Sequence, residues 1–291
     1  MMSLKSFLTS IVLCFSIALN LNAAESGGSS YLPGFYGDFG MALTPATGSY
    51  LSNFLGYNTV SDKNSNSNLT FELPGLVHVT NQEVLGGRYW FGFYPYVLRT
   101  ESKTPNNHTT RSGAGDMYAM PIALSWQWQE VSLLFFQGIV MPTGTYQTQR
   151  ALNSGRNYWT LDENLALTWQ PKNTPFELSL NLGYMINTKN QKTDYRTGDE
   201  LHFDYCLGYY LTKEFAVGVT GSYYQQLTKD TGEGVPMNAI RGEYSSIGPA
   251  LMYNTKLFDH EVMFSGKWLH EYNVNNHVAG DYIILRTVLA F

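Results

Sequence analysis

Apolar and polar residues alternate with a period of two over most of the chain. In residues 176–187 the even-numbered positions from Phe176 to Ile186 are apolar or aromatic, and most odd-numbered positions are polar or small. Residues 200–211 and 215–223 follow the same pattern. Because successive side chains of a β-strand point to opposite faces, each segment is predicted to form a strand with one apolar and one polar face.

The alternation predicts twelve strands, whose connections differ in length in a regular order. The strands cover residues 47–59, 69–79, 87–100, 113–128, 131–142, 158–169, 176–187, 200–211, 215–228, 243–255, 261–272 and 281–291. Long polar connections at 60–68, 101–112, 143–157, 188–199, 229–242 and 273–280 alternate with short ones at 80–86, 129–130, 170–175, 212–214 and 256–260. This arrangement is typical of outer-membrane barrels, in which both termini lie on the periplasmic side. The fold class is therefore predicted to be all-β, an antiparallel up-and-down transmembrane β-barrel.

Composition favours a membrane barrel over a soluble domain. Only 14% of the residues are charged and 15% are aromatic, whereas about 25% of the residues of soluble domains are charged. No apolar run of about 18 residues follows the N-terminal segment, so no membrane-spanning helix is expected. The net charge of −5 gives no indication of a nucleic-acid partner.

The chain is predicted to have three parts. Residues 1–24 have a basic start, an apolar core and small residues at the end, as in a secretory signal peptide. Residues 25–46, here called the leader, precede the barrel at 47–291. Without the signal peptide, Cys206 is the only cysteine, so no intramolecular disulfide is expected.

The leader is rich in glycine and aromatic residues and shows no alternation. Aromatic side chains bury large apolar areas when they pack, so the leader is expected to pack inside the lumen as a partial plug rather than to remain disordered. The residues expected to do so are Tyr31, Phe35, Tyr36 and Phe39.

The polar face of the predicted strands would line the lumen. Its members include Asp162, Asn164, Glu177, Asn181, Glu200, His202, Asp204, Tyr224, Gln226, Lys267 and Glu271. One interpretation is a hydrated, mutually hydrogen-bonded interior; the other is a selective path with a site around Glu200, His202 and Asp204. No metal or other cofactor is expected, because no second histidine lies at ligand spacing from His202.

A barrel enzyme that acts on lipid or lipopolysaccharide is an alternative, and a structural or adhesive barrel is another. The chain has no Gly-x-Ser-x-Gly motif. The best catalytic set that separate strands could assemble is His270 with Ser222 or Ser265 as nucleophile. Catalysis is not predicted, since His270 is more simply interpreted as a polar residue near a strand end.

The last predicted strand ends on an aromatic residue, Phe291. A terminal aromatic on an alternating strand resembles the assembly signal of bacterial outer-membrane proteins, so the barrel-assembly machinery is an expected partner. Outer-membrane lipid and lipopolysaccharide are expected around the barrel wall.

Several segments resemble the meta-pathway phenol-degradation family of outer-membrane proteins: "GGSSYLPGFYGDFG", "GRNYWTLD", "TDYRTGDELHFDY", "GSYYQQLTKDTGEG", "IGPALMY" and "HEYNVNNHVAGDYIILRTVLAF". The resemblance spans about residues 27–291. One departure is Lys189, where family members tend to carry an acidic residue. The resemblance implies a barrel in the bacterial outer membrane that admits small hydrophobic or aromatic compounds. We therefore expect a passive channel or transporter rather than an enzyme.

Overall fold

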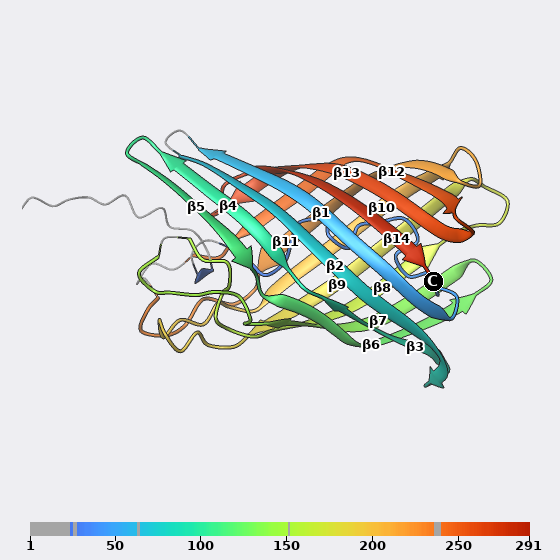
Figure 1. Ribbon diagram of the computed structural model, residues 1–291, viewed down its shortest axis with the longest axis horizontal. Coiled ribbons are helices and arrows are strands. Elements are labelled where there is room, and N and C mark those ends of the chain that lie inside the picture. Colours follow the sequence, from blue (N-terminus) through green and yellow to red (C-terminus); the bar gives the residue numbers. More distant parts are fainter. Residues whose placement is uncertain (1–23, 26–27, 63–64, 151, 236–239) are drawn as a thin grey trace, which may run out of the picture.

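The computed structural model describes residues 24–25, 28–62, 65–150, 152–235 and 240–291. The expected signal peptide lies outside the described residues, apart from Ala24. The described chain is all-β (Figure 1). Its strands are β1 (Gly48–Asp62), β2 (Ser65–Val84), β3 (Gly87–Tyr94), β4 (Val97–Thr104), β5 (Asn107–Ala114), β6 (Met117–Trp128), β7 (Val131–Met141), β8 (Thr160–Trp169), β9 (Phe176–Asn187), β10 (Glu200–Tyr210), β11 (Phe215–Gln226), β12 (Glu243–Leu257), β13 (His260–Asn275) and β14 (Gly280–Ala290).

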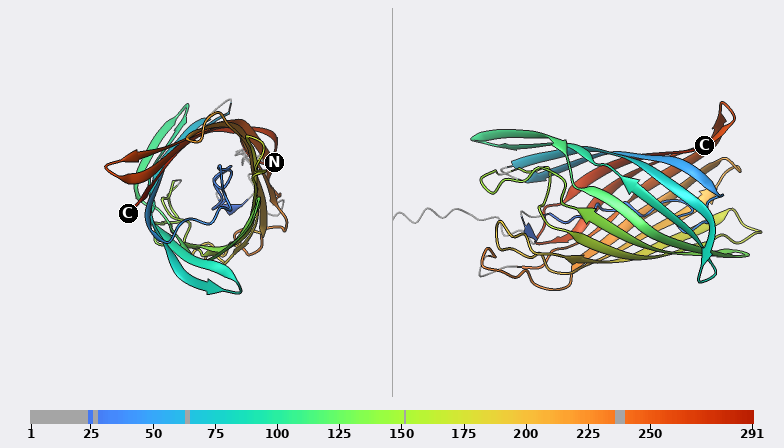
Figure 2. Two further views of the ribbon diagram at one scale, coloured as in Figure 1. Left: turned by 90° about the vertical axis from the view of Figure 1, so that its right-hand side faces the viewer. Right: turned by 60° about the horizontal axis from the view of Figure 1, so that its bottom comes forward.

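The strands close into an antiparallel barrel. Strands that follow one another in the chain pair, except β3 with β4 and β5 with β6, and β1 pairs with both β2 and β14, which joins the two ends of the sheet. The end-on view shows the resulting ring (Figure 2). β3 and β4 pair with different parts of β2, so together they form one interrupted strand. β6 pairs with β3 and β5 pairs with β4, so β5 and β6 form a second interrupted strand. Counting each of these two interrupted strands once gives the predicted twelve-stranded barrel, which confirms the fold class.

Two predicted strands, 87–100 and 113–128, are wrong as continuous elements. The first is interrupted at Pro95 and Tyr96, and the second at Gly115 and Asp116. Proline has no backbone N–H to donate to a ladder, so Pro95 ends β3. On the far side of the interruption β5 pairs with β4 alone among the described strands, because β7 already ends at Met141.

Two predicted long loops, 60–68 and 101–112, are also wrong. β1 and β2 pair up to Asp62 and Ser65, and β4 and β5 pair up to Thr104 and Asn107. These hairpins extend beyond the apolar part of the wall, where both faces meet water. Their side chains are therefore polar on both sides, and the alternation that marks a strand in the sequence disappears.

The longest remaining connections lie at one rim, the loop rim, which carries 142–150, 152–159, 188–199, 227–235 and 240–242 as well as the four-residue connection 276–279. The other rim, the turn rim, carries the short connections 85–86, 129–130, 170–175, 211–214 and 258–259. In outer-membrane barrels the long loops are extracellular. The turn rim, which also holds both ends of the barrel sequence, is then periplasmic.

The outer surface of the barrel is apolar. On β8, for example, Leu161, Leu165 and Trp169 are exposed, whereas Asp162 and Asn164 between them are buried. No helix in the described part is long and apolar enough to cross a membrane. A closed barrel satisfies every backbone polar group within the wall, and such an apolar surface is stable only against lipid. The protein is therefore an outer-membrane barrel.

The described leader lies inside the ring of strands (Figure 2). Tyr31, Tyr36 and Ala42 belong to one buried cluster with wall residues such as Phe136 and Met185, and Phe39 belongs to another. The chain reverses at Gly34, whose φ is +66°. This left-handed conformation favours glycine, and a Cβ at Gly34 would lie 2.3 Å from Leu269 Cδ1, so any other residue would also have to displace that side chain.

Candidate functional site

All eleven residues expected to line the lumen lie inside the barrel. Each is 5% exposed or less, and most contact the leader or one another rather than open space. The set is Asp162, Asn164, Glu177, Asn181, Glu200, His202, Asp204, Tyr224, Gln226, Lys267 and Glu271. These residues therefore form a packed polar layer beside the leader.

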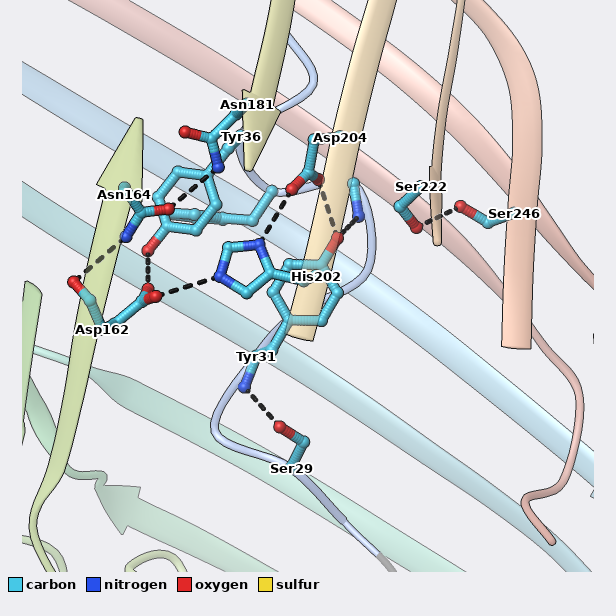
Figure 3. A network of polar contacts seen from close by, with 12 residues as sticks. Ser29, Tyr31, Tyr36, Asp162, Asn164, Asn181, His202, Asp204, Ser222 and Ser246 are labelled. Atoms are coloured by element: carbon cyan, nitrogen blue, oxygen red, sulfur yellow. Dashed lines mark hydrogen bonds and ion pairs between the residues drawn. The ribbon is translucent and has the colours of Figure 1, made fainter. Parts of the chain in front are cut away.

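His202 on β10 is the centre of a buried polar network (Figure 3). Its Nε2 lies 3.0 Å from Asp162 Oδ1 on β8, and its Nδ1 lies 3.2 Å from Asp204 Oδ2 on the same strand. Both ring nitrogens face carboxylate oxygens, so a doubly protonated imidazolium can donate to both. Asp162 and His202 reach each other across β9 because Gly183 lies between them; a Cβ there would be 2.0 Å from His202 Nε2.

Two leader tyrosines complete this network. The Tyr31 hydroxyl donates to Asp204 Oδ1 at 2.7 Å, and the Tyr36 hydroxyl donates to Asp162 Oδ2 at 2.8 Å (Figure 3). Both rings also stack on His202, with centroid distances of 4.3 Å for Tyr31 and 5.4 Å for Tyr36. Asp204, which was predicted to be part of a selective path, and the lumen-lining residue Asp162 therefore both bind the leader.

The other two aromatic leader residues pack against apolar groups. Phe35 lies 4.5 Å from Phe54 on β1, measured between ring centroids. Phe39 is buried with Cys206 of β10. All four expected plug residues are thus in contact with the wall.

A second group of charges holds the leader turn at β13. Lys267 Nζ donates to the carbonyl oxygens of Gly34 and Gly37 at 2.7 and 3.0 Å and lies 3.5 Å from Asp38 Oδ1. Arg286 on β14 also pairs with Asp38, at 3.2 Å. Asp38 was missed by reasoning from the sequence. The sequence feature that could have indicated a buried acidic partner is Lys267, a lone lysine on an inward face.

The remaining polar residues of the lumen fall into the same pattern in part. Glu177 Oε1 accepts a hydrogen bond from the Gly40 N–H at 2.5 Å, and Glu200 Oε2 accepts one from the Ser29 hydroxyl at 2.5 Å. Two others bind the barrel instead. Gln226 donates to Asp230 Oδ1 at 2.6 Å, and Glu271 accepts from the Gly280 N–H at 2.7 Å.

Arg156 and Asp116 connect the leader to the loop rim, and neither was singled out in the sequence. The Arg156 guanidinium donates to the Gly28 and Ser29 carbonyl oxygens, each at 2.5 Å. Asp116 accepts hydrogen bonds from the backbone N–H groups of Gly144 and Arg156 at 2.8 and 2.6 Å. Asp116 thereby fixes loop 142–159, and the loop in turn fixes the start of the leader.

A cavity of about 350 Å³ lies beside this contact. Residues of the leader, β2, β4 and the loop segment 152–158 line it. Its lining includes leucines from the strands, and Asp116, Arg156 and Tyr158 from the loop side. Binding pockets for small ligands have volumes of roughly 300–1,000 Å³, and a mostly apolar lining with a few polar groups is typical of them.

The proposed catalytic set does not assemble. Ser265, Lys267 and Glu271 of β13 point inward, whereas His270 is exposed on the outer face and contacts Asp281 Oδ1 at 3.0 Å. The period of two places His270 on the opposite side of the wall from Ser265 and from Ser222, which is also buried. Among the described residues, no group of three or more His, Cys, Asp or Glu could hold a metal ion.

Comparison with one solved structure supports the fold. An outer-membrane channel from Pseudomonas putida F1 is 16% identical, with a TM-score of 0.75 over 90% of this chain and 100% of that chain. A FadL homologue from Pseudomonas aeruginosa is more remote, at 8% identity and a TM-score of 0.47 over 84% of this chain and 90% of that chain. No curated protein sequence matches the chain. A family model described as "Putative MetA-pathway of phenol degradation" matches residues 34–287. The chain therefore belongs to this family of phenol-degradation proteins.

Proposed function

We propose that this protein is a passive outer-membrane channel for small hydrophobic or aromatic compounds, with the leader as its plug. The observation that carries the proposal is the position of the leader inside a closed barrel, beside an apolar-walled cavity at the loop rim. Membership of the family supports the same conclusion. A non-enzymatic role fits the position of His270 on the outer face.

Uptake into intact Gram-negative cells tests the proposal. Cells that express the full chain are compared with cells that carry the empty vector. We expect faster initial uptake of labelled toluene and p-cresol and unchanged uptake of a disaccharide, because the polar residues of the lumen are engaged by the leader. Equal uptake of the aromatic compounds in the two strains, with the barrel present in the outer membrane, would contradict the proposal.

A disulfide between the leader and the wall tests whether the leader must move. A Cβ at Gly37 would lie 2.6 Å from the present Oγ1 of Thr220, which suits a sulfur in place of that oxygen. Gly37→Cys with Thr220→Cys, in a Cys206→Ala background, should lose uptake when oxidised and regain it when reduced. The Cys206→Ala chain alone is the matched control.

A further inference from the structure

Two turns at the turn rim each carry a large apolar residue with almost no cover. The turn between β2 and β3 consists of Leu85 and Gly86, and the turn between β12 and β13 consists of Phe258 and Asp259. Leu85 is 86% exposed and Phe258 is 95% exposed. Of the large apolar residues in the described part of the chain, these two are the most exposed. They are called the tip residues below.

The backbone of these two turns does not favour bulky residues. In two-residue hairpin turns with positive φ at both positions, Asn-Gly and Asp-Gly are the usual pairs. The φ angles are +53° at Leu85 and +49° at Phe258, a left-handed conformation that is strained for a bulky side chain. The turn 129–130 at the same rim has the polar Gln129 at its left-handed position, with a φ of +40°. Turn geometry therefore does not account for the tip residues, which points to a contact made by their side chains.

Contacts at the base hold each hairpin in place. Trp126 Nε1 of β6 donates to the Leu85 carbonyl oxygen at 3.1 Å. On the other hairpin, His260 Nδ1 lies 3.0 Å from the Ala290 carbonyl oxygen of β14, which is within hydrogen-bond distance. The tip residues are therefore presented on braced hairpins rather than on loose loops.

Both hairpins project outward from the barrel. In the end-on view the teal β2–β3 hairpin and the red β12–β13 hairpin extend beyond the ring of strands (Figure 2). Around an outer-membrane barrel the space outside the ring at this rim belongs to the lipid of the periplasmic leaflet. Tips that point away from the lumen face this leaflet, whereas a periplasmic protein seated on the mouth of the lumen would not cover them.

Charged side chains lie within three residues of each tip. Glu83 pairs with Arg88 at 3.9 Å, and Lys256 pairs with Glu261 at 4.0 Å. All four side chains are partly or largely exposed, so they require water or lipid head groups around them. Segments that lie in a membrane interface combine such charges with Leu or Phe side chains that reach the boundary of the acyl chains.

We propose that Leu85 and Phe258 are membrane anchors whose side chains insert among the phospholipids of the periplasmic leaflet. In the order of strand pairing, β14 and β1 separate the two hairpins. The anchors therefore flank the β1–β14 pair that closes the barrel, and they fix the height and tilt of this side of the barrel in the membrane. This role goes beyond the proposed function and does not depend on the compound that is transported.

Spin labels beside the tips test the anchors. In a Cys206→Ala background, Val84→Cys and Leu257→Cys each carry a nitroxide label on the full chain, in nanodiscs of phosphatidylethanolamine and phosphatidylglycerol. Collisions of the label with oxygen, which concentrates in lipid, are compared with collisions with a nickel chelate that stays in water. We expect oxygen to dominate at both positions. A label at Lys213→Cys, in the exposed turn 211–214, is the control, and the nickel chelate should dominate there.

Leu85→Asn and Phe258→Asn show whether the tip residues cause the insertion. Asparagine tolerates the left-handed conformation, so each hairpin keeps its turn. The label beside the substituted tip should shift toward the nickel chelate, while the label on the other hairpin stays unchanged. A label that the nickel chelate reaches with the wild-type tip, or one that stays in lipid after the substitution, would overturn the anchors. Protection from both reagents would overturn them as well, because it would show a protein, such as a second copy of the chain, over the tips.

Discussion

Replacing Lys267 by methionine should release the leader from the lumen. All the contacts of Lys267 Nζ described above are with the leader: the carbonyl oxygens of Gly34 and Gly37 and the carboxylate of Asp38. The Lys267 side chain is 2% exposed, so its charge has little other compensation while the leader is inserted. When the leader leaves, the lysine faces a water-filled lumen. The substitution therefore destabilises the inserted state selectively.

The size of this destabilisation follows from the burial of the ion pair between Lys267 and Asp38. Removing one member of a buried ion pair costs about 3–5 kcal/mol. Asp38 retains Arg286 at 3.2 Å, so the lower value is the appropriate one. A loss of about 3 kcal/mol raises the ratio of displaced to inserted leader on the order of 100-fold, since each factor of ten corresponds to about 1.4 kcal/mol.

Two measurements report displacement of the leader. In planar bilayers, Lys267→Met should open far more often than the wild type. Cys206 is fully buried beside Phe39, so its rate of labelling by a maleimide should rise by a similar factor. Lys213→Met, in an exposed turn at the turn rim, is the control. If Lys267→Met shows a heat-modifiable barrel but wild-type conductance and labelling, Lys267 does not hold the leader.

Three further predictions concern single contacts. Tyr36→Phe removes a hydrogen bond to a buried carboxylate, worth about 1.5–3 kcal/mol, and should increase maleimide labelling less than Lys267→Met does; no increase would contradict its role. Gly183→Ala should displace His202, whose Nε2 lies 2.0 Å from the position of the added Cβ, and should thereby increase labelling; a wild-type rate would show that the network tolerates the methyl group. Hydrogen bonds from Lys189 and from a backbone N–H lower the pKa of Asp194, in loop 188–199. The ionised Asp194 carboxylate therefore stabilises the loop fully above its unfolded pKa of about 3.9. This stabilisation is lost as the pH falls through the lower pKa of the folded state. Resistance of this loop to pepsin should thus decline only below about pH 4, and a decline at pH 5–6 would contradict the assignment.

The period of two was sufficient to predict which residues face the lumen. Along β13, Lys267 and Glu271 are buried and His270 is exposed, as an alternating strand requires. Boundaries were harder to predict wherever the strands leave the membrane. The β4–β5 hairpin is polar on both faces, so nothing in its sequence distinguishes it from a loop.

Contacts between elements could not be predicted from alternation. Asp162 and His202 belong to strands that do not pair with each other, and they meet only because Gly183 on β9 lies between them. That contact depends on the register of three strands, which a pattern along one strand does not contain. Arg156 was missed for a similar reason, because its partners are backbone carbonyl oxygens of the leader, 127 and 128 residues away in the chain.

The hydrogen bonds between the leader and the carboxylates of the lumen change the interpretation of the acidic lumen. Carboxylates that line an open pore select ions through their charge, and the sequence alone suggested such a path around Glu200, His202 and Asp204. In the structure Asp204 accepts from Tyr31, Asp162 from Tyr36, Glu200 from Ser29 and Glu177 from a leader N–H. Buried carboxylates are stable only with such partners, so they are strong acceptors for a segment that carries hydroxyl and N–H donors. These carboxylates of the barrel wall therefore hold the leader rather than line an open path.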